Sequence, residues 1–139
     1  MASYKRFEDL PVWQKARVLA READELIHES AIKKNFKLRD QISSSSGSIM
    51  DNIAEGFERG GNKEFVSFLS IAKGSAGEFR SQMYRSSDCN YIGEKEFNHF
   101  LNDVKVISSE LQKLITYLED SDLKGHKFSN RCRFFLNKF

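Results

Sequence analysis

Residues 43–61 read SSSSGSIMDNIAEGFERGG, and they constrain the fold more than any other part of the chain. Four serines and a glycine are typical of a flexible linker between domains. The spacing of apolar and small residues nevertheless continues through them without a break, as it would inside one amphipathic helix. Serine and glycine inside a helix cost about 0.5–1 kcal/mol each relative to alanine, so close packing against another backbone is expected. The positions on this face are Leu38, Ile42, Ser45, Ser46, Ile49, Ile53, Gly56 and Phe57.

Three further apolar runs have the same helical spacing, at residues 12–27, 65–83 and 97–118. Asp9 and Asn62 are candidate N-caps of the first and third of these helices, and Pro11 fits a first helical turn. One proline and eight glycines in 139 residues suit long helices better than many strands and turns. The prediction is an all-α, antiparallel up-down four-helix bundle over residues 1–120, followed by a short C-terminal extension, residues 121–139.

The chain is expected to be cytoplasmic, and its charge is unevenly distributed. No apolar run approaches the roughly 18 residues of a membrane span, and the N-terminus lacks an apolar signal core. The net charge is +2, but residues 121–139 carry five cations against Asp122, so the first 120 residues sum to −2. The extension interleaves its cations with phenylalanines, which could contact phosphates and bases. The preferred alternative is that the extension docks on the bundle through its phenylalanines.

The second and third helices carry small residues outside their core faces, where Lys, Glu and Gln are usual. Small side chains let another backbone approach closely, so these positions predict a subunit interface; the alternative is an ordinary solvated surface. The candidate interface residues are Ser43, Gly47, Met50, Ala54 and Phe57 on the second helix, and Ser67, Ser70, Gly74, Gly77 and Ser81 on the third.

A polar group on the second helix allows two interpretations. Asn52, Glu55 and Arg59 lie within about 60° of one another on a helical projection. They predict either a polar network that fixes the register between helices or subunits, or a solvated Glu55–Arg59 pair.

Several short motifs place the chain in a family. It resembles the bacterial four-helix-bundle proteins, also called intervening-sequence-encoded proteins of large-subunit ribosomal RNA, over about residues 7 to 118. The motifs that carry this resemblance are the opening FEDLPVWQKA (7–16), Gln41-Ile42, Ser48-Ile49, NIAEG (52–56), Arg59, Glu64-Phe65, Phe68-Leu69, IAKGS (71–75), Glu78 and Tyr91-Ile92.

The resemblance implies a ring-like homo-oligomer, expected to be a pentamer, and no established enzymatic activity. A related branch, the accessory protein of diversity-generating retroelements, associates with nucleic acid and a reverse transcriptase. RNA or DNA and such a protein are therefore candidate partners. Two departures are Ser43 and Ser44, which stand where relatives often carry basic residues, and the added residues 121–139.

The short motifs of the chain do not predict catalytic or metal chemistry. Two Glu-x-x-His pairs, Glu25/His28 and Glu96/His99, match half of a di-iron carboxylate signature. Their helical phase turns them away from the core, so no metal site is expected. Neither Cys89 nor Cys132 has a His and an acid nearby in sequence. The chain is therefore predicted to be neither an enzyme nor dependent on a cofactor.

Two functions remain. The first is a nucleic-acid-associated accessory protein, in which the oligomer multiplies a weak basic patch on each subunit. The second is a protein–protein scaffold without a nucleic-acid role, which the slightly acidic body favours. The candidate phosphate-binding residues are Lys73, Arg85, Arg131, Arg133 and Lys138.

Overall fold

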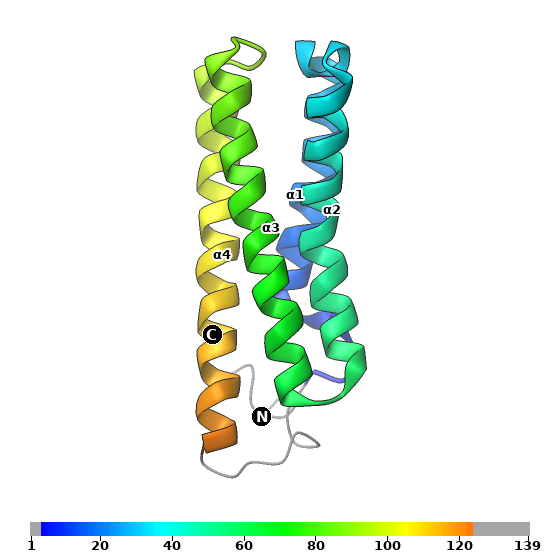
Figure 1. Cartoon of the computed structure of the whole chain (residues 1–139), viewed down its shortest axis with the longest axis vertical. Coiled ribbons are helices and arrows are strands. Elements are labelled where there is room, and N and C mark those ends of the chain that lie inside the picture. The colour runs from blue at the N-terminus through cyan, green and yellow to red at the C-terminus, as the bar shows by residue number, and fades with distance from the viewer. Residues whose placement is uncertain (1–3, 124–139) are drawn as a thin grey trace.

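The computed structural model describes residues 4–123 and consists of four long helices in this range. Arg131, Arg133, Lys138 and the predicted docking of the extension lie outside the described residues. The helices run alternately up and down (Figure 1), which confirms the predicted antiparallel four-helix bundle. They are α1 (Pro11–Glu29), α2 (Phe36–Arg59), α3 (Asn62–Asp88) and α4 (Glu94–Leu123), with short 3₁₀ segments at Phe7–Asp9 and Ala31–Lys34.

Both predicted N-caps are wrong. Asp9 belongs to the first 3₁₀ segment, and Leu10, in extended conformation, precedes α1, whose first residue is Pro11. Proline suits this position because its missing N–H would have no partner in the first turn. Asn62 is the first residue of α3, preceded by Gly61, and its side chain is buried. Asn35 does cap α2 through its side chain, which accepts a hydrogen bond from the Leu38 amide at 3.1 Å.

The hairpin turns contain the residues that tolerate left-handed backbone. Gly60 ends α2 with φ of 95°, a conformation that glycine adopts without steric cost. At the opposite end of the bundle, Asn90 has φ of 59° between α3 and α4. The segment KKNFK (33–37) joins α1 to α2: its two lysines end the second 3₁₀ segment, Asn35 caps α2, and Phe36 and Lys37 begin that helix.

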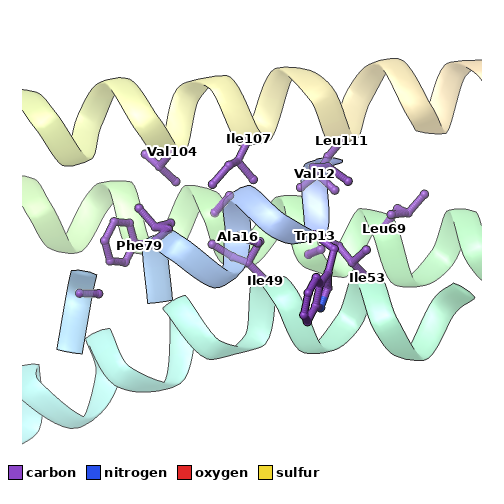
Figure 2. Packing of buried hydrophobic residues seen from close by; sticks show 14 of the residues in the cluster. Val12, Trp13, Ala16, Ile49, Ile53, Leu69, Phe79, Val104, Ile107 and Leu111 are labelled. Carbon is purple, nitrogen blue, oxygen red and sulfur yellow. The ribbon is translucent and has the colours of Figure 1, made fainter. Parts of the chain in front are cut away.

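The core lies along the axis of the bundle, and all four helices contribute to it. Figure 2 shows buried side chains from all four helices, among them Val12 of α1, Ile49 of α2, Leu69 of α3 and Ile107 of α4. The serines in the linker-like stretch face inward as the periodicity predicts: Ser45 is 1% exposed and Ser46 3% exposed. The largest fully buried side chains include Phe65 and Phe79, both on α3.

The helix pairs differ in how extensively they pack. Helices α2 and α3 pack most closely, and a methyl group at Gly56 would lie only 2.6 Å from the Phe68 Cβ. Glycine is required there because no side chain fits between the two backbones. The α1–α4 seam is the least extensive of the four seams between neighbouring helices.

Candidate functional site

The small residues of α3 form a continuous exposed face. Ser67, Ser70, Gly74, Gly77 and Ser81 are all solvent-exposed, and we call them the small-residue face of α3. The Ser67 and Ser70 hydroxyls donate to the carbonyl oxygens of Lys63 and Val66, one turn back, at 3.1 and 2.9 Å. These hydroxyls therefore satisfy their hydrogen bonds within the helix and leave a smooth surface.

Three helical glycines, one on α2 and two on α3, are not required by packing within the described residues. A Cβ added at Gly47, Gly74 or Gly77 would have nothing within 4 Å beyond its own local backbone. Each costs about 1 kcal/mol of helix stability relative to alanine. Gly56, by contrast, is held by the close approach of Phe68. The packing of residues 4–123 explains one of these four helical glycines and leaves the other three unexplained.

The candidate interface residues of α2 are only partly exposed. Ser43 is exposed, Gly47 is half-buried, and Met50 and Ala54 pack against the core while remaining partly accessible; we call these four the flank of α2. Phe57 differs, because it is 5% exposed and its ring meets that of Phe65 edge to face at 5.9 Å. Phe57 is therefore a core residue of the single chain and is not available as a surface contact.

The flank of α2 and the small-residue face of α3 are separate surfaces that point in different directions. On α2, Ser45 and Ser48 face α3, since they bond to Gln82 and Ser75. At 100° per residue, the flank of α2 lies about 160° from that direction. On α3, Gly74 and Gly77 lie about 110° from the side that faces α2. The first surface therefore points away from α3, the second does not face α2, and the two do not adjoin.

The predicted polar group on α2 is divided between two places. The Asn52 amide donates to the Ser48 carbonyl and hydroxyl oxygens at 2.8 and 2.9 Å, and Ser48 in turn accepts from Ser75 of α3 at 2.9 Å. Glu55 and Arg59 instead form an exposed i,i+4 ion pair at 2.9 Å. Asn52 therefore belongs to a polar contact between α2 and α3, and the other two form a solvated pair.

A buried hydroxyl–amide cluster between α2 and α3 was missed by the sequence reasoning. Ser45 donates to the Gln82 Oε1 at 2.6 Å, and Ser86 donates to the Gln82 carbonyl at 2.8 Å. All three residues are less than 5% exposed. The signal was a glutamine beside Met83 on the core face of α3.

Replacing Gln82 with leucine is expected to lower the free energy of unfolding by about 1 kcal/mol, because the Ser45 hydroxyl loses its 2.6 Å bond to Gln82 and keeps only the longer 3.3 Å bond to the Ile42 carbonyl. Chemical denaturation measures the change. The double variant Ser45→Ala/Gln82→Leu should recover much of the loss, since removing both polar groups leaves neither unsatisfied. A double variant less stable than Gln82→Leu would contradict this account.

Basic side chains gather with an exposed aromatic ring at the α1–α2 connection. Phe36 is 66% exposed, and the Arg39 guanidinium lies over its ring at 4.8 Å. Lys33, Lys34 and Lys37 are exposed on either side of it. We call these five residues the basic-aromatic patch. Its signal in the sequence is KKNFKLR, and none of its residues is among the predicted phosphate-binding positions.

The phosphate-binding candidates on α3 are not brought together. Arg85 is exposed and donates to the Gln41 side chain of α2 at 3.1 Å. Lys73 is half-buried and lies more than three helical turns from Arg85. The two cations therefore lie at different levels of α3.

The rejected Glu-x-x-His pairs lie outside the core, as their phase predicts. Glu25, His28, Glu96 and His99 are all solvent-exposed. His99 nevertheless meets two carboxylates that the sequence reasoning did not pair with it, Glu22 of α1 and Asp103 of α4. Across residues 4–123, no helix is long and apolar enough to span a membrane.

Comparison with known proteins supports the expected family. Among solved structures, a crystal structure of a protein of unknown function from the S23 ribosomal protein family of Bacteroides thetaiotaomicron matches with a TM-score of 0.69. The two sequences are 25% identical, and the match covers 75% of this chain and 97% of that one. A search of curated proteins finds no match. The family model described as 23S rRNA-intervening sequence protein matches residues 8–113. The chain belongs to this family of 23S rRNA-intervening sequence proteins.

Proposed function

We propose that the protein is a non-enzymatic helical module whose copies assemble into a closed ring, with five copies as the expected number. The observation that supports this most is the open space around Gly47, Gly74 and Gly77. A neighbouring backbone seated against these positions would account for residues that weaken their own helices. The exposed serines beside them bond within their helix and would not resist burial.

The presence of two separate surfaces that point in different directions favours a ring over a two-fold dimer. A two-fold interface uses the same patch on both subunits, whereas a ring joins two different patches head to tail. The flank of α2 on one copy would meet the small-residue face of α3 on the next. Each subunit then uses both surfaces once, and rotation closes the assembly.

Replacing Gly77 with arginine is expected to convert the assembly to monomers without harming the fold. The new side chain would enter open space in the single chain and would improve helix propensity by about 1 kcal/mol. In the assembly it would separate the packed backbones. Sedimentation velocity at micromolar concentration measures the outcome, with Ser109→Arg on the exposed side of α4 as the matched control. A wild-type chain that sediments as a monomer would refute the ring.

We further propose that the ring binds nucleic acid through the basic-aromatic patch. Cations that contact phosphates and an exposed ring that stacks on bases are the elements of single-strand binding. Phe36 supplies the exposed ring, and Lys33, Lys34 and Lys37 supply the cations within a few residues of it. Repetition around a ring would multiply a patch that is weak in one copy.

The variant Lys33→Glu/Lys37→Glu is expected to weaken binding of single-stranded RNA and DNA by at least about tenfold at low salt. The matched control is Lys105→Glu/Lys113→Glu, the same charge change on exposed positions of α4. Mobility-shift titrations at two salt concentrations measure both affinity and its salt dependence. An intact ring that shifts neither nucleic acid at low salt would favour the alternative, a protein–protein scaffold, which the excess of acids over cations within residues 4–123 supports.

A further inference from the structure

We propose that Glu22, His99 and Asp103 form a binding site for a divalent transition-metal ion, such as Zn²⁺, which fastens α1 to α4. Among the residues that the structure describes, these form the one group of three potential ligands whose donor atoms converge, all within 4.8 Å of one another. The site is independent of the proposed ring and of nucleic-acid binding.

The geometry of the imidazole carries the proposal. The same nitrogen of His99, Nε2, lies 3.2 Å from the Glu22 Oε2 and 3.3 Å from the Asp103 Oδ2. A single N–H can serve both oxygens only through a shared, weaker bifurcated bond, and an Nε2 without hydrogen would turn its lone pair toward two anions. A metal ion between the three atoms satisfies all of them at once.

The distances also suit a small cation. Zinc binds nitrogen and oxygen ligands at about 2.0–2.2 Å, so adjacent ligands of a tetrahedral site lie about 3.3 Å apart. Both His99–carboxylate distances have this value. One imidazole with two carboxylates is a nitrogen–oxygen set that favours Zn²⁺ and related ions over Mg²⁺ or Ca²⁺, which prefer oxygen alone.

The supporting helices fix the three ligands. His99 and Asp103 are one turn apart on α4, and Glu22 reaches across from α1. The side chains of Glu22, His99 and Asp103 are 28%, 47% and 44% exposed, which leaves room for water to complete the coordination. Asp103 also lines a surface pocket of about 370 Å³ between α1 and α4, so the ion would face a space that can hold water.

The position explains what the ion would do. The α1–α4 seam is the least extensive of the bundle. The Lys15–Glu110 ion pair already links the two helices there, and Lys15 lies about two helical turns before Glu22 on α1. A bound ion would add a second cross-link on the same seam. Because it would bind the folded chain and not the separated helices, it would stabilise the fold.

Titration of the full-length protein with Co²⁺ and Zn²⁺ tests the site. Calorimetry should give one ion per chain, and Co²⁺ should show the visible spectrum of nitrogen–oxygen ligation without a thiolate charge-transfer band. His99→Ala should weaken binding of the ion by about a hundredfold. Removing a residue that only orients a metal ligand already lowers metal affinity by about 10–100-fold, and removing the ligand itself should cost at least as much. Saturating Zn²⁺ should raise the melting temperature of the wild type by about 5 °C and leave that of His99→Ala unchanged.

The chain supplies a matched control. His28 and Asp24 are also a His–Asp pair one turn apart, and both side chains are exposed on α1. The His28 Nδ1 lies 3.7 Å from the Asp24 Oδ2. His28→Ala should bind the ion as the wild type does, while Glu22→Gln and Asp103→Asn should bind it more weakly. Equal binding by His99→Ala and wild type, a thiolate band that disappears in Cys89→Ser, or no saturable binding would each overturn the proposal.

Discussion

Replacing Phe65 with alanine is expected to lower the free energy of unfolding by about 3–5 kcal/mol. Phe65 is completely buried on α3, and its ring packs edge to face against that of Phe57 on α2. Its removal forfeits the burial of a large apolar side chain and leaves a cavity that rigid helices fill only partly. For a domain whose total stability is about 5–15 kcal/mol, this is a large fraction.

Chemical denaturation at fixed protein concentration measures the effect, and the melting temperature should fall by about 10–20 °C. Phe36→Ala is the control, since the same atoms are removed from a side chain that is 66% exposed. Its effect should stay within about 0.5 kcal/mol. A loss below about 1 kcal/mol at Phe65 would mean that the α2–α3 seam relaxes around the cavity and is not closely packed.

The architecture could be predicted from the sequence because the apolar residues of every helix recur at the three- and four-residue spacing of one helical face. Ser45 and Ser46 show how strong this signal is: their polarity argued for a linker, yet their place in the periodicity correctly put them inside. The helix starts were less predictable. Asp9 and Asn62 are good N-cap residues by type, but neighbouring Leu10 and Gly61 occupy those positions because of local backbone geometry.

The candidate sites were harder to predict, since they depend on which residues meet across helices. Periodicity put Glu96 and His99 outside the core correctly, but could not bring Glu22 of α1 to His99. Phe57 fitted both a core face and a surface flank, and only packing against Phe65 decided between them. Gln82 likewise needed a partner on another helix before its burial made physical sense.

Replacing Gly56 with leucine is expected to destabilise the bundle by about 3 kcal/mol, at the upper end of overpacking effects. Even the first added carbon would lie 2.6 Å from the Phe68 Cβ and 3.0 Å from the Phe65 ring. The Cβ of Phe68 is fixed to its backbone, so α2 and α3 must separate, and the gain in helix propensity of about 1 kcal/mol cannot compensate.

The sign of the effect distinguishes the two kinds of helical glycine in this chain. Gly74→Ala should stabilise an isolated chain by about 1 kcal/mol, because the methyl group enters open space, whereas Gly56→Ala should destabilise it. Both substitutions are measured by denaturation in the monomeric Gly77→Arg background, so that assembly does not contribute. If Gly74→Ala stabilises that monomer but destabilises the wild-type assembly, the space beside Gly74 is filled by another copy. A neutral effect of Gly56→Leu on the free energy of unfolding would contradict the close approach of α2 and α3 at Phe68.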